Sequence, residues 1–172
     1  AKYIPSLQIL EKLCMTDSTN WTYSSYLSSI YMQQNRFDDA IRIYSRFLPA
    51  DSVNVRYLDM TGFAYLKKGD HLTAARLYNK SLSVNSKDLT AMKNLAYIYS
   101  AAGKPDTAIA ILTRGIKTDS SDVSLYSLRA QIYYLRKYTK RAMDDYLVVL
   151  ASGDSSKLVL KRIGIGYCNN FQ

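Results

Sequence analysis

The chain has little of what catalysis and metal binding usually need. Its 172 residues include one histidine, two cysteines and three prolines. A zinc site or a histidine-dependent active site would lack most of its usual ligands or bases, because no Cys or His pair has ligand spacing. No glycine-rich loop follows a strand in a way that would cradle a phosphate. We therefore predict that the protein is not an enzyme and binds neither a cofactor nor a metal.

Long apolar runs are also missing. No stretch approaches the roughly 20 apolar residues that a membrane-spanning helix requires, so we expect no transmembrane segment. The hydrophobic share of 48% and the charged share of 22% are typical of a folded chain. The sequence starts at Ala1 rather than at a methionine, so a leader or an anchor is not excluded, and both a cytoplasmic and an exported location fit. Cys14 and Cys168 stand far apart in the sequence and are expected to be unpaired.

What the chain does have is a repeat of 34 residues. The sequence aligns with itself over 21–54, 55–88, 89–122 and 123–156 without any insertion. One column of the alignment holds small residues, Ser28, Gly62, Ala96 and Ala130. A second column holds Tyr31, Tyr65, Tyr99 and Tyr133, and a third holds Ala40, Ala74, Ala108 and Ala142. A fixed period of this size is typical of stacked supersecondary units rather than of one globular core.

Helix geometry explains the columns. In the third unit, apolar residues recur at i, i+3, i+4 and i+7, in Met92, Leu95, Ala96 and Tyr99. This spacing predicts a helix over 90–102, which Gly103 ends, and a second helix that opens at Pro105. Two helices joined by so short a turn lie antiparallel, and small residues are needed where they cross. By the same reasoning we expect helices over 3–15, 22–34, 38–48, 56–68, 72–84, 124–136 and 139–151.

These columns resemble the signature of the tetratricopeptide repeat (TPR) family. That signature places a small residue at the eighth position, an aromatic at the eleventh, alanine at the twentieth and an aromatic or apolar residue at the twenty-fourth. It is matched by Gly62, Tyr65, Ala74 and Tyr78 in one unit, and by Ala130, Tyr133, Ala142 and Tyr146 in another. The resemblance implies an all-α fold, a right-handed α-solenoid of antiparallel helix pairs.

The segments outside the four full repeats are interpreted as half repeats. Residues 1–20 hold only a second helix, and residues 157–172 hold a first helix or a cap, with Leu160, Ile163, Gly164 and Tyr167 on the expected columns. Pro49 should end the helix before it early and leave a loop over 49–54. The internal turn of the fourth unit, 136–138, lacks glycine and is expected to be tight and costly. The linker 152–156 is expected to be flexible, and the chain is interpreted as an excerpt of a longer protein.

The resemblance assigns partner binding to the face of the first helices that lies between the packing columns. The positions on that face are Tyr26, Ser29, Gln33, Asp59, Met60, Phe63, Lys67, Lys93, Asn94, Tyr97, Leu128, Gln131, Tyr134 and Leu135. We select as candidate binding residues Tyr26, Met60, Phe63, Lys67, Lys93, Asn94, Tyr97, Gln131 and Tyr134. Aromatic rings can anchor the side chains of a peptide, and amides can bond its backbone. The predicted function is a protein–protein interaction scaffold that holds a peptide or an extended segment of a partner. A chain with 16 tyrosines also leaves some exposed without a role.

Charge supports a rival hypothesis. The formal net charge is +9, and the second helices carry Arg42, Arg46, Arg76, Lys80 and Arg114 on their outward side. This pattern is interpreted as a solvated face, with nucleic-acid or acidic-partner binding as the alternative. A further alternative is self-association through the half repeats. The acidic pairs 38–39 and 144–145 are interpreted as residues at helix starts that stabilise the helix dipole, not as catalytic carboxylates.

Overall fold

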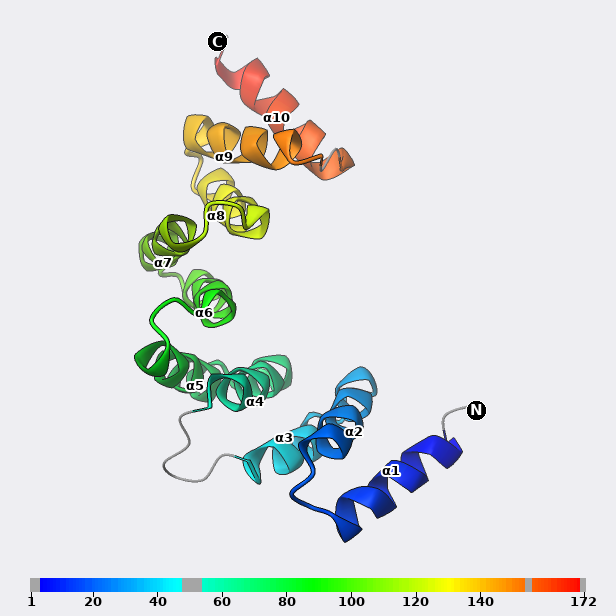
Figure 1. Ribbon diagram of the computed structural model, residues 1–172. Coiled ribbons are helices and arrows are strands. Elements are labelled where there is room, and N and C mark those ends of the chain that lie inside the picture. The colour runs from blue at the N-terminus through cyan, green and yellow to red at the C-terminus, as the bar shows by residue number, and fades with distance from the viewer. Residues whose placement is uncertain (1–3, 48–53, 154–155, 171–172) are drawn as a thin grey trace. The chain divides into compact units, whose positions relative to one another are not determined.

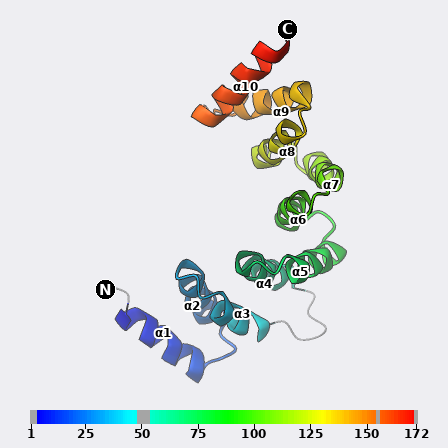
Figure 2. The same ribbon diagram turned by 180° about the vertical axis from the view of Figure 1, so that it is seen from behind.

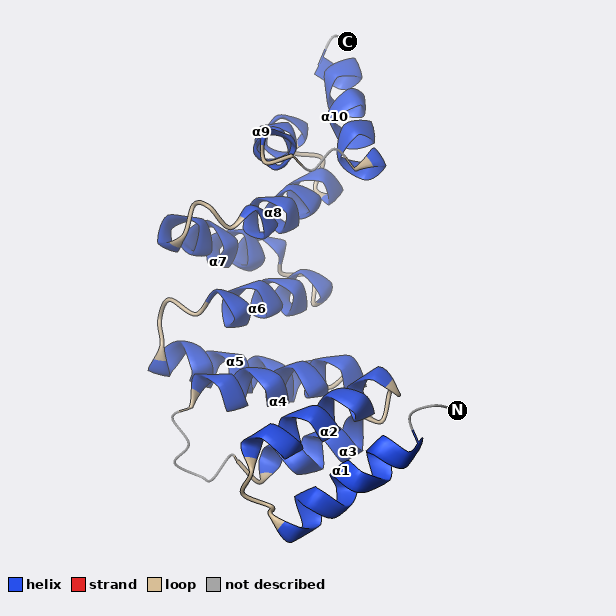
Figure 3. Cartoon of the chain, turned by 45° about the vertical axis from the view of Figure 1, so that its right-hand side comes forward, coloured by secondary structure: helices blue, strands red, loops and turns tan. Residues whose placement is uncertain are grey.

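The structure is a computed structural model that describes residues 4–47, 54–153 and 156–170. These residues form ten α-helices and no strand (Figure 3). The helices are α1 (Ile4–Thr16), α2 (Trp21–Gln33), α3 (Phe37–Ser45), α4 (Val55–Lys68), α5 (His71–Val84), α6 (Leu89–Ala101), α7 (Pro105–Thr118), α8 (Val123–Leu135), α9 (Thr139–Ala151) and α10 (Lys157–Asn170). The fold is an all-α helical-repeat solenoid, as predicted. The number and limits of its repeats stay predictions.

The chain divides into two compact units, residues 1–91 and 92–172, which are described separately. In unit 1, α1 packs on α2, α2 on α3, α3 on α4, and α4 on α5 (Figures 1 and 2). In unit 2, α7 packs on α8, α8 on α9, and α9 on α10. The principal contacts within each unit thus join helices that follow each other in the sequence, which is how a repeat array packs.

The columns seen in the sequence are packing positions. Every member of the alanine column is buried: Ala40, Ala74, Ala108 and Ala142. In unit 1, a Cβ added to Gly62 would lie 3.1 Å from Cζ of Tyr78, whose side chain is fully buried. In unit 2, a Cβ added to Gly115 would lie 3.1 Å from Cδ2 of Leu125. Small residues therefore stand where one helix lies directly against a large side chain of the next.

The starts of the first helices share a capping residue that our sequence reasoning did not use. The residue before each helix accepts a hydrogen bond from the backbone of the first turn: Asn20 from Thr22, Asn54 from Arg56, Asp88 from Thr90 and Asp122 from Ser124, at 3.0–3.1 Å. Such caps satisfy backbone N–H groups that a helix start leaves unpaired. The last position of the first three 34-residue units, and of the half repeat before them, was a readable signal, since Asn or Asp recurs there.

The turn inside each helix pair has one conformation. Its central residue is left-handed in all four pairs, with φ of 58° at Asn35, 93° at Gly69, 73° at Gly103 and 61° at Lys137. In the fourth pair the Tyr138 amide donates to the Tyr133 carbonyl at 2.9 Å, and the Lys104 amide donates to Tyr99 in the same way at 2.8 Å. The expected tighter turn at 136–138 is therefore wrong, because the hydrogen bonding is the same. The expected strain is present, since lysine disfavours positive φ.

The end of α3 and the buried side of α10 differ from expectation. Helix α3 ends at Ser45, three residues before the predicted 48. The expected loop at 49–54 lies, except for Asn54, outside the described residues, as do 154 and 155 of the expected linker. On α10 the buried residues are Val159, Ile163 and Gly166, whereas Leu160 and Gly164 are exposed. The columns predicted at Leu160 and Gly164 are therefore wrong, because α10 is buried on the side that faces α9. The side chains of Tyr167 and Cys168 lie outside the described residues.

Candidate binding faces on the first helices

Unit 1 brings four of the predicted residues onto helices α2 and α4, and we call this set the unit 1 face: Tyr26, Met60, Phe63 and Lys67. Tyr26 is 61% exposed and Phe63 is 41% exposed, although both rings are large and apolar. Lys67 is exposed, and its ammonium nitrogen lies 5.2 Å from the centroid of the Phe63 ring. Met60 is half-buried and packs against the core of the unit. The face therefore offers two aromatic surfaces and one cation.

The sequence analysis placed Asp59 on the same face, where an exposed side chain is expected. In the structure one oxygen of its carboxyl group is buried. Its Oδ1 atom is buried without a hydrogen-bond partner, and its carboxyl group interacts with Asp88 and Ser81. Burial, followed by the charge of Asp88, raises the pKa of Asp59 to about 7. The assignment of Asp59 to the binding face is therefore not supported by its placement.

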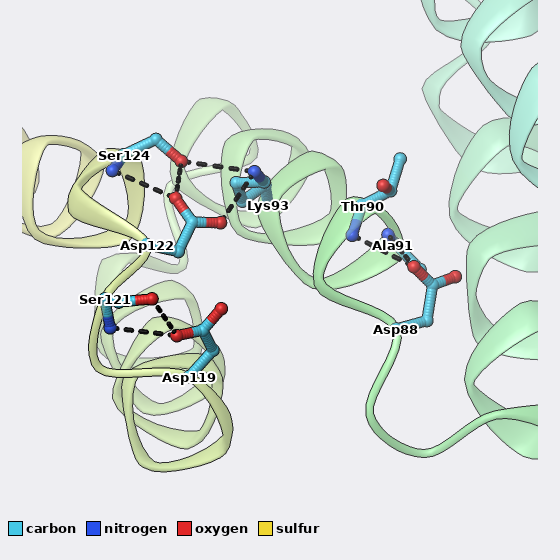
Figure 4. A network of polar contacts seen from close by, with 8 residues as sticks. All are labelled: Asp88, Thr90, Ala91, Lys93, Asp119, Ser121, Asp122 and Ser124. Atoms are coloured by element: carbon cyan, nitrogen blue, oxygen red, sulfur yellow. Dashed lines mark hydrogen bonds and ion pairs between the residues drawn. The ribbon is translucent and has the colours of Figure 1, made fainter.

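Unit 2 brings together the other five predicted residues on α6 and α8, and we call this set the unit 2 face: Lys93, Asn94, Tyr97, Gln131 and Tyr134. Tyr97 is 55% exposed. Lys93 is half-buried, and its ammonium group donates to Asp122 at 3.0 Å and to Ser124 at 3.1 Å (Figure 4). These contacts join α6 to the start of α8, so Lys93 has a structural partner already.

Tyr134 is less available than the sequence suggested. The ring is half-buried and packs against the core cluster of Ala130, Ala142, Tyr146 and Val149. The guanidinium carbon of Arg162 on α10 lies 4.3 Å from its centroid. Arg162 also donates to the hydroxyl of Tyr146 at 3.0 Å. This contact could not be predicted from the sequence, because Arg162 comes from another helix at no repeat spacing.

A cavity adjoins the unit 2 face. It has a volume of about 580 Å³ and is lined by Lys93, Val123, Ser124, Ser127, Leu128 and Val149. Two of these residues, Lys93 and Leu128, were predicted from the sequence to face a partner. The lining mixes apolar side chains with two hydroxyls and one ammonium group, which suits a short peptide segment.

Asp145 has a different role from the one predicted. It lies in the middle of α9 rather than at its start, and it is buried. Its carboxylate accepts from Arg129 Nε at 2.8 Å and from Nη2 at 2.7 Å, while Arg129 Nη1 donates to Thr113 at 2.9 Å. The helix-start prediction is therefore wrong for 144–145. It is confirmed for Asp38 and Asp39, which lie in the first turn of α3.

A second cavity, in unit 1, lies away from the unit 1 face. Its volume is about 230 Å³, and it is lined by Glu11, Cys14, Met15, Leu27, Tyr31, Arg36, Arg42, Ile43 and Arg46. Burial raises the pKa of the Cys14 thiol, so its reactive thiolate is disfavoured. Arg36 and Arg42 both pair with Asp39 at 2.7 Å. This cavity therefore offers no activated nucleophile.

The described part of the chain holds neither a metal-binding cluster nor a membrane-spanning helix. No group of three His, Cys, Asp or Glu side chains there is arranged to hold a metal ion. Among the helices of residues 4–47, 54–153 and 156–170, none is both long and apolar enough to cross a membrane.

Several solved structures resemble this fold. The chain aligns with MamA at a TM-score of 0.69 and 19% identity, covering 84% of this chain and 89% of that one. A thermophilic TPR protein of Thermus thermophilus aligns at a TM-score of 0.75 and 14% identity, over 96% of this chain and 91% of that one. YrrB, described as a TPR protein with an unusual peptide-binding site, aligns at 0.70 and 14% identity, over 94% and 83%. At these identities the likeness concerns the fold alone.

Family models give a more specific result. No curated protein sequence matches the chain. Two models of the tetratricopeptide repeat do match, one over residues 27–89 and the other over residues 65–132. Together they span 27–132, which is more than half of the 172 residues. They cover the second half of α2, helices α3 to α7 and most of α8, including the turns at Gly69 and Gly103. The chain therefore belongs to the tetratricopeptide repeat family.

Proposed function

We propose that this protein is a protein–protein interaction scaffold that binds a peptide, or an extended segment of a partner, on the exposed faces of its first helices. The observation that carries the proposal is the pair Phe63 and Tyr97. They occupy the same position in successive 34-residue segments, and both rings are exposed. Exposed aromatic rings at one repeated position suit the recognition of side chains that recur along an extended chain.

The chemistry of the two faces supports a partner with apolar anchors and few cations. On the unit 1 face, Lys67 lies beside the aromatic ring of Phe63. The neighbouring Asp59 does not supply an exposed negative charge to this face, because burial raises the pKa of its carboxyl group. The cavity beside the unit 2 face is about 580 Å³, room for one or two side chains. YrrB, which shares the fold, is described as having a peptide-binding site. That description supports peptide recognition as a use of this fold.

The test uses a display library of random peptides selected against the wild-type chain. The face variant carries Tyr26→Ala, Phe63→Ala and Tyr97→Ala. The control variant carries Leu72→Ala, Val84→Ala and Leu147→Ala, which remove equally exposed apolar side chains from the second helices α5 and α9. Tyr134 is left unchanged because its ring also packs against the core.

We expect the face variant to retain the selected peptides at least about tenfold less well, and the control variant to retain them as the wild type does. Equal retention by both variants, or failure of the library to yield any binder, would remove these faces from the proposal. Far-UV circular dichroism of each variant establishes that the helices are intact.

A further inference from the structure

A buried acidic cluster lies inside unit 1, behind the exposed side of α4. Asp59 on α4, Tyr78 and Ser81 on α5, and Asp88 at the start of α6 contribute its polar groups. Tyr78 and Ser81 are fully buried, and Asp88 is buried. Two of the polar atoms in this cluster have no hydrogen-bond partner: Oδ1 of Asp59 and the hydroxyl of Tyr78. Two carboxyl groups in such surroundings cannot both be charged cheaply.

The hydrogen bonds distinguish the two carboxyl groups. Asp88 accepts from the Ser81 hydroxyl at 2.7 Å. Its other oxygen accepts from the amides of Thr90 and Ala91 at 3.0 and 3.3 Å (Figure 4). Three donors and the start of a helix favour the charged form of Asp88. Asp59, by contrast, keeps one oxygen unpartnered and faces the charge of Asp88. The proton therefore belongs on Asp59.

We propose that Asp59 and Asp88 share one proton in the folded protein, and that loss of this proton loosens the packing of α4 on α5 and on the start of α6. The proton resides on Asp59, from which it can bridge to the Asp88 carboxylate. When it leaves, two negative charges face each other in surroundings that are largely buried. The structure then becomes sensitive to pH in a range where surface carboxylates no longer titrate.

Charges on the neighbouring elements do not offset this pair. Two ionisable groups act on the Asp59 carboxyl or respond to it. The charge of Asp88 raises the pKa of Asp59. The pKa of Tyr78 is itself raised, by burial and then by Asp59 and Asp88. On α4, Arg56 stacks on Trp21, Lys67 lies over Phe63 and Lys68 pairs with Asp38 of α3. On α3, Asp39 pairs with Arg36 and Arg42. On α5, His71, Arg76 and Lys80 are exposed.

The sign of the pH effect follows from the direction of the shift. Burial, and then Asp88, raises the pKa of Asp59 from 3.8 to about 7. The folded state therefore holds a proton that the unfolded chain releases. The stability that depends on this proton is complete below about pH 4, declines as pH rises, and is lost above about pH 7.

The first experiment compares urea unfolding of the wild type, Asp59→Asn and Asp144→Asn at about pH 5 and about pH 8.5. An asparagine at 59 can donate to Asp88 permanently, as the protonated acid does. Asp144 is exposed and supplies the matched control. We expect the unfolding constant of the wild type and of Asp144→Asn to rise at least about tenfold more between the two pH values than that of Asp59→Asn. An equal rise in all three proteins overturns the proposal.

The second experiment observes the proton directly in the folded wild type, and circular dichroism establishes that each variant is folded. Carbon-13 NMR of the side-chain carboxyls of the wild type should show one aspartate that titrates well above about pH 5, and this signal should be missing from Asp59→Asn. In Asp88→Asn its midpoint should fall. A wild type in which every aspartate titrates in the ordinary range contradicts the proposal. An unchanged midpoint in Asp88→Asn shows that burial alone holds the proton, and it overturns the sharing.

Discussion

A largely buried ion pair in unit 2 joins Arg129 on α8 to Asp145 on α9. Two parallel hydrogen bonds of 2.7–2.8 Å join the guanidinium to the carboxylate, and a third joins it to Thr113. The contact ties α7, α8 and α9 together. The pKa of Arg129 is raised, first by its hydrogen bonds to Asp145, so the guanidinium stays charged. A buried pair of this kind is costly to break from one side only.

Removing one partner should therefore destabilise the protein strongly. We predict that Asp145→Ala lowers the free energy of unfolding by about 3–5 kcal/mol, because it leaves the Arg129 charge buried and unpaired. The neighbouring Asp144→Ala, an exposed position on the same helix, should change it by no more than about 0.5 kcal/mol. Urea unfolding followed by circular dichroism measures both. Equal costs for the two variants would show that the pair does not stabilise the fold.

At this scale the sequence predicted the apolar residues better than the polar ones. The small residues and the alanine column recur at a fixed spacing, so their burial could be read directly. Asp145 and Asp59 could not be placed in this way, because their partners Arg129 and Asp88 come from other elements at separations that no periodicity reveals. Adjacent carboxylates were given a dipole role at a helix start, although residue 139, the predicted and observed start of α9, lies five residues before Asp144 and leaves both outside the first turn.

At the scale of helices and turns, the repeated left-handed residue is the feature that fixes how each pair reverses direction. Glycine supplies it in two pairs, whereas Asn35 and Lys137 supply it in the others. A lysine in this conformation costs roughly 1–2 kcal/mol, because its Cβ crowds the following carbonyl oxygen. The fourth pair therefore carries strain that the second and third pairs avoid.

Relieving that strain should stabilise the protein. We predict that Lys137→Gly raises the free energy of unfolding by about 1 kcal/mol, because glycine adopts positive φ without the clash. The reverse change, Gly103→Ala in the equivalent turn, should lower it by a similar amount. Thermal unfolding monitored by circular dichroism compares the two. A loss of stability in Lys137→Gly would mean that the lysine side chain contributes more than its backbone costs.

Helix limits were predictable to within about one residue for most helices. The second helix over 139–151 was predicted and observed with the same limits, and the first helices α2, α4, α6 and α8 start one residue before their predicted start. The turn at 136–138 was misjudged because it lacks glycine, although the backbone there follows the same path as at Gly103. The burial of residues on α10 was misjudged because the repeated columns of a first helix are buried by helices on both of its sides. The buried residues described on α10 face α9 alone.

At the scale of the whole molecule, each of the two units is held together mainly by contacts between consecutive helices. Stability in helical-repeat arrays is close to a sum of the repeats and their neighbouring interfaces. The net charge of +9 includes exposed residues such as Arg76 and Arg114. Nucleic-acid binding through these residues, and self-association through the half repeats, stay predictions of lower rank than binding on the two faces.

The most direct measurement of the central claim is site-specific photo-crosslinking of a peptide selected from the display library. A benzoylphenylalanine replaces Phe63 or Tyr97 on the first helices in one set of proteins, and Leu72 or Leu147 on the second helices in another. The account predicts crosslinks from Phe63 and Tyr97 that excess unlabelled peptide abolishes, and none from Leu72 or Leu147. Crosslinks that form equally from both sets, or only from the second helices, would contradict it.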